Sequence, residues 1–184
     1  MRVIAGKFKG RILKMPKGAK IRPSSQKIKA ALFNILGEQI HGASFLELFA
    51  GSGNIGIEAL SHGAVKVTFV ERNRLCIKAI QSNLKRLGLE AEILSFDVER
   101  AIHLLKQKGE KFDFVFLDPP YYEDKLKNCL IKLGRYDILR PHSYVIAEHN
   151  KREVLPEQLP RLKLMFTKRY GDAALSFYRK EGKG

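Results

Sequence analysis

The sequence predicts an α/β fold with one mostly parallel, seven-stranded sheet, and three observations support it. Apolar strand-like segments alternate with amphipathic helical segments between residues 44 and 148. A glycine-rich turn joins the first of these strands to the helix that follows it. Acidic residues stand at or near the ends of five strands, namely Glu47, Glu71, Asp97, Asp118 and Glu148. This alternation is typical of a parallel sheet with helices on both faces, which binds ligands beyond the carboxyl ends of its strands.

The individual elements follow from apolar periodicity and from glycine and proline breaks. Helices are expected at residues 28–36, from the glycine turn to Gly63, and at 72–87, 98–108 and 125–133. Strands are expected at residues 45–50, 65–70, 91–96, 112–117 and 144–147. Residues 162–170 and 173–179 flank Gly171-Asp172 and predict an antiparallel hairpin at the sheet edge. Residues 2–5 and 11–15 predict a small N-terminal hairpin.

Positive charge is concentrated at the two ends of the chain. The net charge is +15, and ten lysine and arginine residues precede the first acidic residue, Glu38. From His149 onward there are nine bases and four acids, whereas the segment between holds 15 of each. This asymmetry favours a polyanionic partner, because each phosphate that is neutralised releases a counterion. A solvated basic surface without a partner is the alternative.

Residues 1–22 are predicted to form a basic hairpin and arm that precede a domain spanning residues 23–184. Phe8, which stands among lysines, could stack on a nucleic-acid base or pin the hairpin to the core. Pro23 ends the arm, and the serines after it are placed to cap a helix. The candidate substrate-binding residues are Lys7, Lys9, Arg11, Arg22 and Ser25.

Composition excludes several other classes of protein. Hydrophobic residues make up 45% of the chain, and no apolar run approaches the length of a membrane span. Residues 1–10 are basic and contain two glycines, so they do not resemble a secretory signal. Cys76 and Cys129 have neither metal-ligand spacing nor the pattern of a disulfide framework. We therefore expect a cytoplasmic protein without a metal site.

The segment Phe45–Gly56 predicts a cofactor site. Gly51, Gly53 and Gly56 have the spacing G-x-G-x-x-G between a strand and a helix, where free N–H groups bind ligands. Glu71 follows 20 residues after Gly51, at the position from which an acid reaches a ribose. A dinucleotide and S-adenosylmethionine both fit this pattern, and a turn without a ligand is the alternative.

Glu47 favours S-adenosylmethionine over a dinucleotide. A carboxylate before the glycine turn would repel a pyrophosphate, but it suits the ammonium and sulfonium groups of the methyl donor. A salt-bridged acid at a strand end remains the alternative for Glu47. The candidate cofactor-binding residues are Glu47, Phe49, Gly51, Gly53, Asn54, Glu71, Arg72, Asp97 and Val98.

The tetrapeptide Asp118-Pro119-Pro120-Tyr121 predicts the catalytic site. Two prolines hold the backbone extended and remove two donors, which leaves carbonyl groups free to accept. The carboxylate and a proline carbonyl can then accept both hydrogens of an exocyclic amine and aim its lone pair at a methyl group. The aromatic ring supplies a stacking surface for the base. An ordinary turn is the alternative reading of these four residues.

In combination, these motifs closely resemble the bacterial RsmD-type methyltransferases, which methylate the N2 amine of a guanine in 16S ribosomal RNA. The similarity covers Arg22-Pro-Ser-Ser, Ala31–Leu36, the segment Leu48–Ala64, Asp118–Tyr121 and Tyr170-Gly171-Asp172. It implies a Rossmann-like fold with S-adenosylmethionine as donor, Glu71 on its ribose and Asp97 near its adenine. It also implies Asp118–Tyr121 around the target amine and an assembled or partly assembled small subunit as substrate.

This chain departs from that family at two places. Family members usually carry Thr-Thr-Asp-Arg where Ser24-Ser25-Gln26-Lys27 stands, and Asp where Glu47 stands. The first departure leaves open which side chain of that loop contacts the methionine end of the donor. Three other functions are also compatible with the motifs: protein-glutamine methylation, DNA adenine methylation, and RNA binding by a non-catalytic ribosome assembly factor.

Overall fold

The computed structural model describes residues 1–16, 18, 24–120 and 125–182, and it confirms the α/β class. The helices are α1 (Gln26–Leu36), the 3-10 helix η1 (Gly37–Ile40), α2 (Asn54–Ser61), α3 (Arg74–Leu87), α4 (Val98–Gln107) and α5 (Lys125–Arg135). The strands are β1 (Ser44–Leu48), β2 (Lys66–Val70), β3 (Glu92–Leu94), β4 (Phe112–Leu117), β5 (Leu139–Asn150), β6 (Gln158–Leu159), β7 (Leu162–Tyr170) and β8 (Ala173–Lys180).

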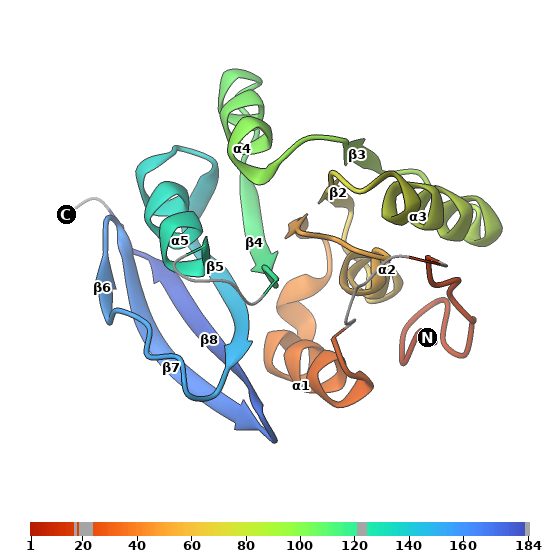
Figure 1. Ribbon diagram of the computed structural model, residues 1–184, viewed down its shortest axis with the longest axis horizontal. Coiled ribbons are helices and arrows are strands. Elements are labelled where there is room, and N and C mark those ends of the chain that lie inside the picture. The colour runs from red at the N-terminus through yellow and green to blue at the C-terminus, as the bar shows by residue number, and fades with distance from the viewer. Residues whose placement is uncertain (17, 19–23, 121–124, 183–184) are drawn as a thin grey trace.

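All eight strands form one mixed sheet in the order β3-β2-β1-β4-β5-β8-β7-β6 (Figure 1). The first five strands in this order, β3, β2, β1, β4 and β5, are parallel to one another. The remaining three, β8, β7 and β6, pair antiparallel with their neighbours. The predicted count of seven was wrong by one, because β6 has only two residues and carries no readable alternation. The predicted C-terminal hairpin also lies inside the sheet, since β8 sits between β5 and β7 and β6 forms the edge.

Alternate side chains of the sheet build two separate cores. Phe114 and Phe116 of β4 pack with residues of α1, α2 and α3 on one face. Val115 and Leu117 pack with residues of α4 and α5 on the other face. Burying a side chain of this size contributes about 1.5–3 kcal/mol. These parallel strands are therefore apolar on both faces, which explains why their sequences read as continuous apolar runs.

The N-terminal residues lie against α2 and α3 (Figure 1, red). Two predicted strands are absent there; a single antiparallel bridge joins Arg2 and Ile12. Val3 and Leu13 point into the core and are buried. Gly6 has a φ of 76°, and a Cβ atom there would stand 1.9 Å from the backbone oxygen of Ser61. Only glycine permits this close approach to α2.

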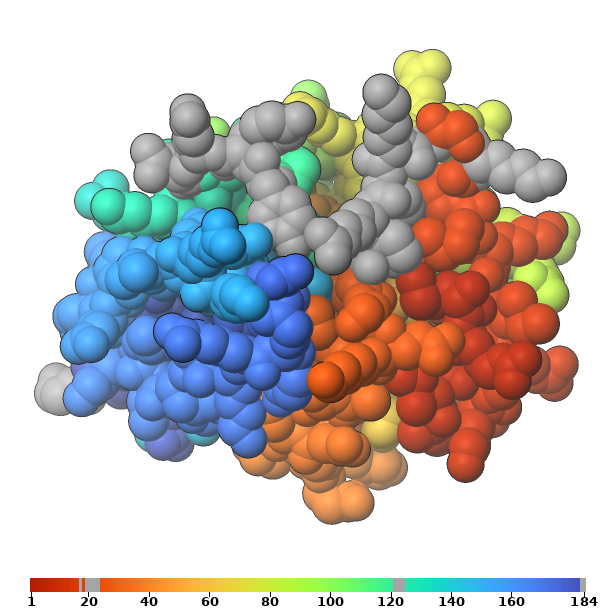
Figure 2. Space-filling model, turned by 60° about the horizontal axis from the view of Figure 1, so that its bottom comes forward, coloured from red at the N-terminus to blue at the C-terminus, as the bar shows by residue number. Residues whose placement is uncertain are grey.

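Two segments rich in lysine and arginine, one from each end of the chain, lie on either side of α1 (Figure 2). In Figure 2 the N-terminal arm (red) and the β7–β8 hairpin (blue) lie on opposite sides of α1 (orange). Exposed bases of the arm include Lys7, Lys9, Arg11 and Lys14, and those of β7 include Lys163, Lys168 and Arg169. The fold thus places a basic segment from each end of the sequence beside α1 (Figure 2).

Candidate functional site

A cavity of about 820 Å³ lies beyond the carboxyl ends of the parallel strands. Residues from the ends of β1, β2, β4 and β5, the start of α1, the segment before α4 and the β7–β8 turn line it. The strand order reverses direction at β1, which pairs with β2 on one side and β4 on the other. This reversal is the position at which open parallel sheets bind their ligands.

The glycine turn forms one wall of the cavity and carries backbone strain. Phe49, which follows β1 directly, has a φ of 58°. A non-glycine residue rarely adopts this conformation, and such strain often occurs at functional sites. Gly53, the N-cap of α2, also has a left-handed backbone, with a φ of 72°. A Cβ atom at Gly56 would stand 2.4 Å from the ring of Phe69, so this glycine permits α2 to pack against β2.

Glu47 lies beneath the turn, where its side chain is buried. Its Oε2 accepts a hydrogen bond of 2.8 Å from the Gly56 N–H, and its Oε1 accepts one of 3.3 Å from Ile55. Burial raises the pKa of Glu47 to about 8, although these two N–H groups favour the ionised form. The acid therefore caps the first turn of α2 while lining the cavity.

Glu71 stands at the end of β2 and fixes the opposite side of the turn. Its Oε2 accepts a hydrogen bond of 2.8 Å from the Gly51 N–H. Its Oε1 accepts bonds of 2.8 Å from both Arg72 and Asn73. Three backbone donors thus hold the carboxylate in one orientation at the cavity wall. A fixed carboxylate of this kind suits a pair of ribose hydroxyl groups.

Asp97 and Phe96 form the next part of the wall. Asp97 is the N-cap of α4, and its Oδ1 accepts a hydrogen bond of 3.0 Å from the Arg100 N–H. The guanidinium of Arg100 lies 4.4 Å from the centre of the Phe96 ring. The cavity thus has an aromatic surface beside an acid, an arrangement that suits a purine ring with an exocyclic amine.

The candidate catalytic residues Asp118, Pro119 and Pro120 directly follow β4 and line the same cavity. Tyr121 lies outside the described residues, as does Arg22. The first three residues of the tetrapeptide therefore line the same cavity as the glycine turn, although Asp118 follows Gly56 by 62 positions in the sequence.

The structure also places the remaining predicted residues. Phe49, Gly51, Asn54, Arg72, Val98 and Ser25 line the cavity together with the acids described above, whereas Gly53 does not. Ser25 additionally caps α1, because its Oγ accepts a hydrogen bond of 3.2 Å from the Ile28 N–H. Lys7, Lys9 and Arg11 lie exposed on the arm and do not line the cavity. The roles assigned to these side chains remain predictions.

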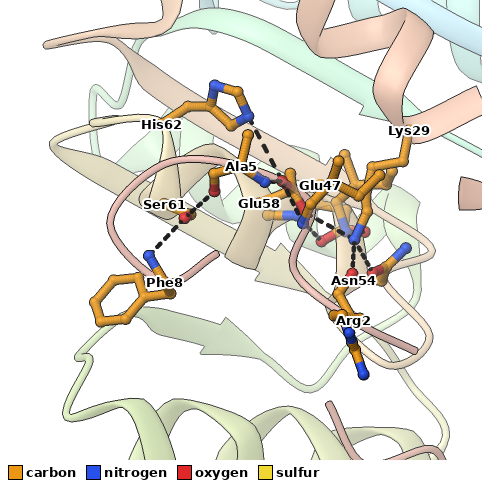
Figure 3. A network of polar contacts seen from close by, with 12 residues as sticks. Arg2, Ala5, Phe8, Lys29, Glu47, Asn54, Glu58, Ser61 and His62 are labelled. Carbon is orange, nitrogen blue, oxygen red and sulfur yellow. Dashed lines mark hydrogen bonds and ion pairs between the residues drawn. The ribbon is translucent and has the colours of Figure 1, made fainter. Parts of the chain in front are cut away.

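Sequence reasoning missed a buried polar network between α1, α2 and the arm (Figure 3). A lysine in an amphipathic helix ordinarily faces water, but the side chain of Lys29 is fully buried. Its ammonium forms an ion pair of 2.7 Å with Glu58, which also accepts hydrogen bonds from the Ile4 and Ala5 N–H groups. Burial lowers the pKa of Lys29, while the Glu58 carboxylate opposes that change.

Phe96 and Ser52 are two further lining residues that the sequence analysis did not select. Phe96 could have been selected from the sequence, because it directly precedes Asp97, an acid at the end of a predicted strand. Ser52 lies between two motif glycines, so its position alone could have identified it. In the part of the chain that the structure describes, no group of His, Cys, Asp or Glu is placed to hold a metal ion. None of the helices in that part is long and apolar enough to cross a membrane.

The chain is similar to proteins named as ribosomal RNA methyltransferases. The family model described as "Conserved hypothetical protein 95" matches residues 1–179. A Bacillus subtilis protein described as "Putative rRNA methyltransferase YlbH" is 41% identical, over 99% of this chain and 100% of its own length. "Ribosomal RNA small subunit methyltransferase D" of Haemophilus influenzae is 35% identical, over 89% of this chain and 86% of its own length.

Solved structures show the same fold. The structure named "Putative methyltransferase yhhF from Escherichia coli" has a TM-score of 0.87 and 30% identity, covering 100% of this chain and 99% of its own. A Thermus thermophilus 16S rRNA N2 G1207 methyltransferase, solved with AdoMet and guanosine, has a TM-score of 0.70 and 23% identity. The second likeness covers 90% of this chain and 45% of that one, and it concerns the fold alone.

Proposed function

The chain belongs to the family described as conserved hypothetical protein 95, and from this premise we propose that it transfers a methyl group from S-adenosylmethionine to the N2 amine of a guanine in 16S ribosomal RNA. One observation supports this proposal above the others. A single cavity is lined by the glycine turn, Glu71 and Asp97 on one side and by Asp118-Pro119-Pro120 on the other. A donor and a target amine would therefore meet in one place. The names of the relatives independently favour ribosomal RNA as substrate.

The residues of the cavity fit S-adenosylmethionine. Glu71, Asp97 and Asp118 all line it, and these acids would repel a pyrophosphate but suit a cationic ligand. Two buried polar atoms in the wall, Ser52 Oγ and Asn54 Nδ2, have no hydrogen-bond partner among the described residues. Buried polar groups are usually paired, so these two atoms favour a polar ligand. Glu71 would accept from the ribose hydroxyls, and Phe96 with Asp97 would contact the adenine.

Asp118 and the prolines after it would activate the amine. Bound S-adenosylmethionine supplies an electrophilic methyl group on a sulfonium. The Asp118 carboxylate and the Pro119 carbonyl would accept the two amine hydrogens, which holds the nitrogen lone pair out of conjugation with the ring. The new C–N bond forms as the C–S bond breaks, and the amine then loses one proton, which Asp118 can accept. The residues of this chain would therefore contribute to catalysis in two ways, by positioning the target amine and by accepting its proton.

The RNA would lie across the face that carries the basic side chains. The arm and β7, which carry exposed bases, lie on either side of α1 (Figure 2), and the first turn of α1 borders the cavity. Phosphate contacts on both sides would orient the RNA without reading its sequence, while the cavity accepts the one base that is methylated. We expect this reaction in the cytoplasm, on an assembled or partly assembled small ribosomal subunit.

Methyl-transfer assays with four substrates test this proposal. The protein is incubated with labelled S-adenosylmethionine and naked 16S RNA, small subunits lacking the modification, duplex DNA or a protein extract. We expect label in the RNA of the small subunits, released on digestion as N2-methylguanosine. Label in DNA or protein, or in another nucleoside, would contradict the proposed substrate. Donor binding without transfer to any of the four would instead indicate a non-catalytic assembly factor.

A further inference from the structure

The ammonium of Lys29 is buried and contacts three oxygen atoms. Its Nζ lies 2.8 Å from the Arg2 backbone oxygen, 2.7 Å from Asn54 Oδ1 and 2.7 Å from Glu58 Oε2. Figure 3 shows the side chain of Lys29 reaching this point from α1. An ammonium has three donors and no acceptor, so these contacts satisfy it fully. The same group therefore ties the arm, α1 and the start of α2 together.

This arrangement determines which way the amide of Asn54 faces. The oxygen and nitrogen of an asparagine side chain have nearly the same shape, so their placement follows from the hydrogen-bond partners. Lys29 can only donate, and hence it requires the oxygen of Asn54. The amide nitrogen must then point away from Lys29. Only 3% of Asn54 is exposed, and its Nδ2 atom has no hydrogen-bond partner among the described residues.

The unpaired amide belongs to the wall of the cofactor cavity. Asn54 and Ser52 both line this cavity, and Ser52 Oγ is likewise buried without a partner in the described parts of the chain. Two buried groups that can donate to one cavity favour a ligand with strong acceptors. The start of α2 favours negative charge at this place, whereas Glu58 already neutralises the Lys29 ammonium. The N–H groups of Ile55 and Gly56 already donate to Glu47, so the side chains of Ser52 and Asn54 remain as donors for a ligand here.

We propose that Lys29 is a positioning residue that aims the amide of Asn54 at the carboxylate of S-adenosylmethionine. This inference rests on the proposed function. The carboxylate is the only anionic group of that molecule, and its ribose would be held at the other end of the turn by Glu71. Lys29 does not line the cavity, so it acts through Asn54 and does not touch the ligand. Ser52 supplies a second donor to the same carboxylate.

Two ligands that differ only in this carboxylate test the inference. The affinities of S-adenosylmethionine and decarboxylated S-adenosylmethionine are measured by calorimetric titration, and their ratio gives the preference for the carboxylate. Asn54→Asp keeps the oxygen that Lys29 requires but replaces the donor with an acceptor. We expect it to reduce the preference by at least about tenfold, as for a lost hydrogen bond to a charged group. The affinity for the decarboxylated ligand should not fall.

Lys29 is tested together with its ion-pair partner, because Lys29→Met alone would leave Glu58 buried and unpaired. The double variant Lys29→Met with Glu58→Gln removes both charges and releases the Asn54 amide. We expect a reduced preference for the carboxylate. The same double change should cause no further reduction in an Asn54→Ala background, since a residue that acts through Asn54 has no effect without it.

The outcomes separate this inference from the proposed function. A wild-type protein that binds neither ligand would contradict the proposed cofactor itself. If the wild type binds S-adenosylmethionine but Asn54→Asp retains the full preference, the carboxylate site is wrong and the proposed function stands. An additive loss from the double variant in the Asn54→Ala background would show that Lys29 does not act through Asn54.

Discussion

Ser24 Oγ donates a hydrogen bond of 2.5 Å to Glu148 Oε2 and so joins the segment before α1 to β5, across 124 residues of sequence. Both side chains are buried, and both border the cavity. The contact holds the start of α1 against the carboxyl end of the sheet. A neutral hydroxyl that faces a buried carboxylate supplies a donor that the acid requires.

Ser24→Ala should therefore destabilise the protein. The carboxylate of Glu148 loses a charge-assisted hydrogen bond, for which we expect a decrease of about 1–3 kcal/mol in the free energy of unfolding. Urea denaturation measures this decrease. Ser95→Ala is the matched control, because Ser95 is exposed and its loss should change stability by less than about 0.5 kcal/mol. Equal effects of the two changes would contradict the structural role of this contact.

Glu71→Gln should weaken binding of S-adenosylmethionine. The amide keeps the shape of the side chain, but it loses the charge that would bind the ribose hydroxyls. A hydrogen bond to a charged group contributes about 1.5–3 kcal/mol, so we expect the dissociation constant to rise by roughly ten- to a hundredfold. Calorimetric titration measures it, with Glu90→Gln at an exposed position as control. An unchanged constant would remove Glu71 from the cofactor site.

Glu47 should make stability depend on pH in a direction opposite to that of most acids. Its pKa is about 8 in the folded protein, against an ordinary value of 4.5. Below pH 4.5 the group is protonated in both states, and its full contribution to stability is present. Between pH 4.5 and 8 only the folded state keeps the proton, so stability falls by up to about 1.4 kcal/mol per pH unit.

Glu47→Gln removes this titration while leaving the other groups unchanged. Unfolding free energies of the wild type and the variant should be compared at pH 5, 6.5 and 8, because the contributions of groups that do not interact with Glu47 then cancel in the difference. We expect the wild type to lose stability relative to the variant as the pH rises. A difference that stays constant over this range would show that Glu47 is ionised throughout.

The exposed lysines of the arm should set the salt dependence of RNA binding. Changing Lys7, Lys9 and Lys14 to Gln should lower the slope of log affinity against log salt by somewhat less than about one for each lost phosphate contact. The affinity for S-adenosylmethionine should not change. The control replaces Lys66, Lys108 and Lys111, which pair with acids near the amino ends of the strands. Equal slopes for the two triple variants would mean that the arm does not contact RNA.

Asp118→Ala should reduce methyl transfer far more than it weakens either ligand, because its contacts strengthen as the amine nitrogen becomes tetrahedral. General-base action alone contributes about two to four orders of magnitude, so we expect at least about a hundredfold loss under single-turnover conditions. Asp118→Asn keeps one acceptor and should retain measurable activity. A wild-type rate in the alanine variant would exclude this residue from catalysis.

Patterns carried by neighbouring residues could be predicted, whereas contacts between distant segments could not. The bounds of β4 and β7 matched the prediction, since uninterrupted apolar runs or clear turn signals define both. β5 begins five residues earlier than expected, because Arg140, Pro141 and His142 interrupt its apolar pattern. The site residues close to the motif glycines and strand ends were selected for the same local reason.

The burial of Lys29 depends on Glu58, on the backbone of Arg2 and on Asn54. The distance in sequence between Lys29 and these partners follows no pattern that would predict a contact. A lysine in an amphipathic helix also ordinarily faces water. The docking of the arm was equally hidden, because it depends on backbone hydrogen bonds to α2 and on the close approach at Gly6.

The position of β8 has a consequence for how the molecule assembles. β5 and β7 pair with opposite edges of β8, yet both are translated before it. Until residues 173–180 have been synthesised, β5 has an open edge and β7 has no strand that connects it to the parallel part of the sheet. The order of synthesis and the order of pairing therefore differ, and during translation β5 exposes backbone groups that other chains could pair with. Pairing of β8 with β5 and β7 completes the sheet and covers these backbone groups.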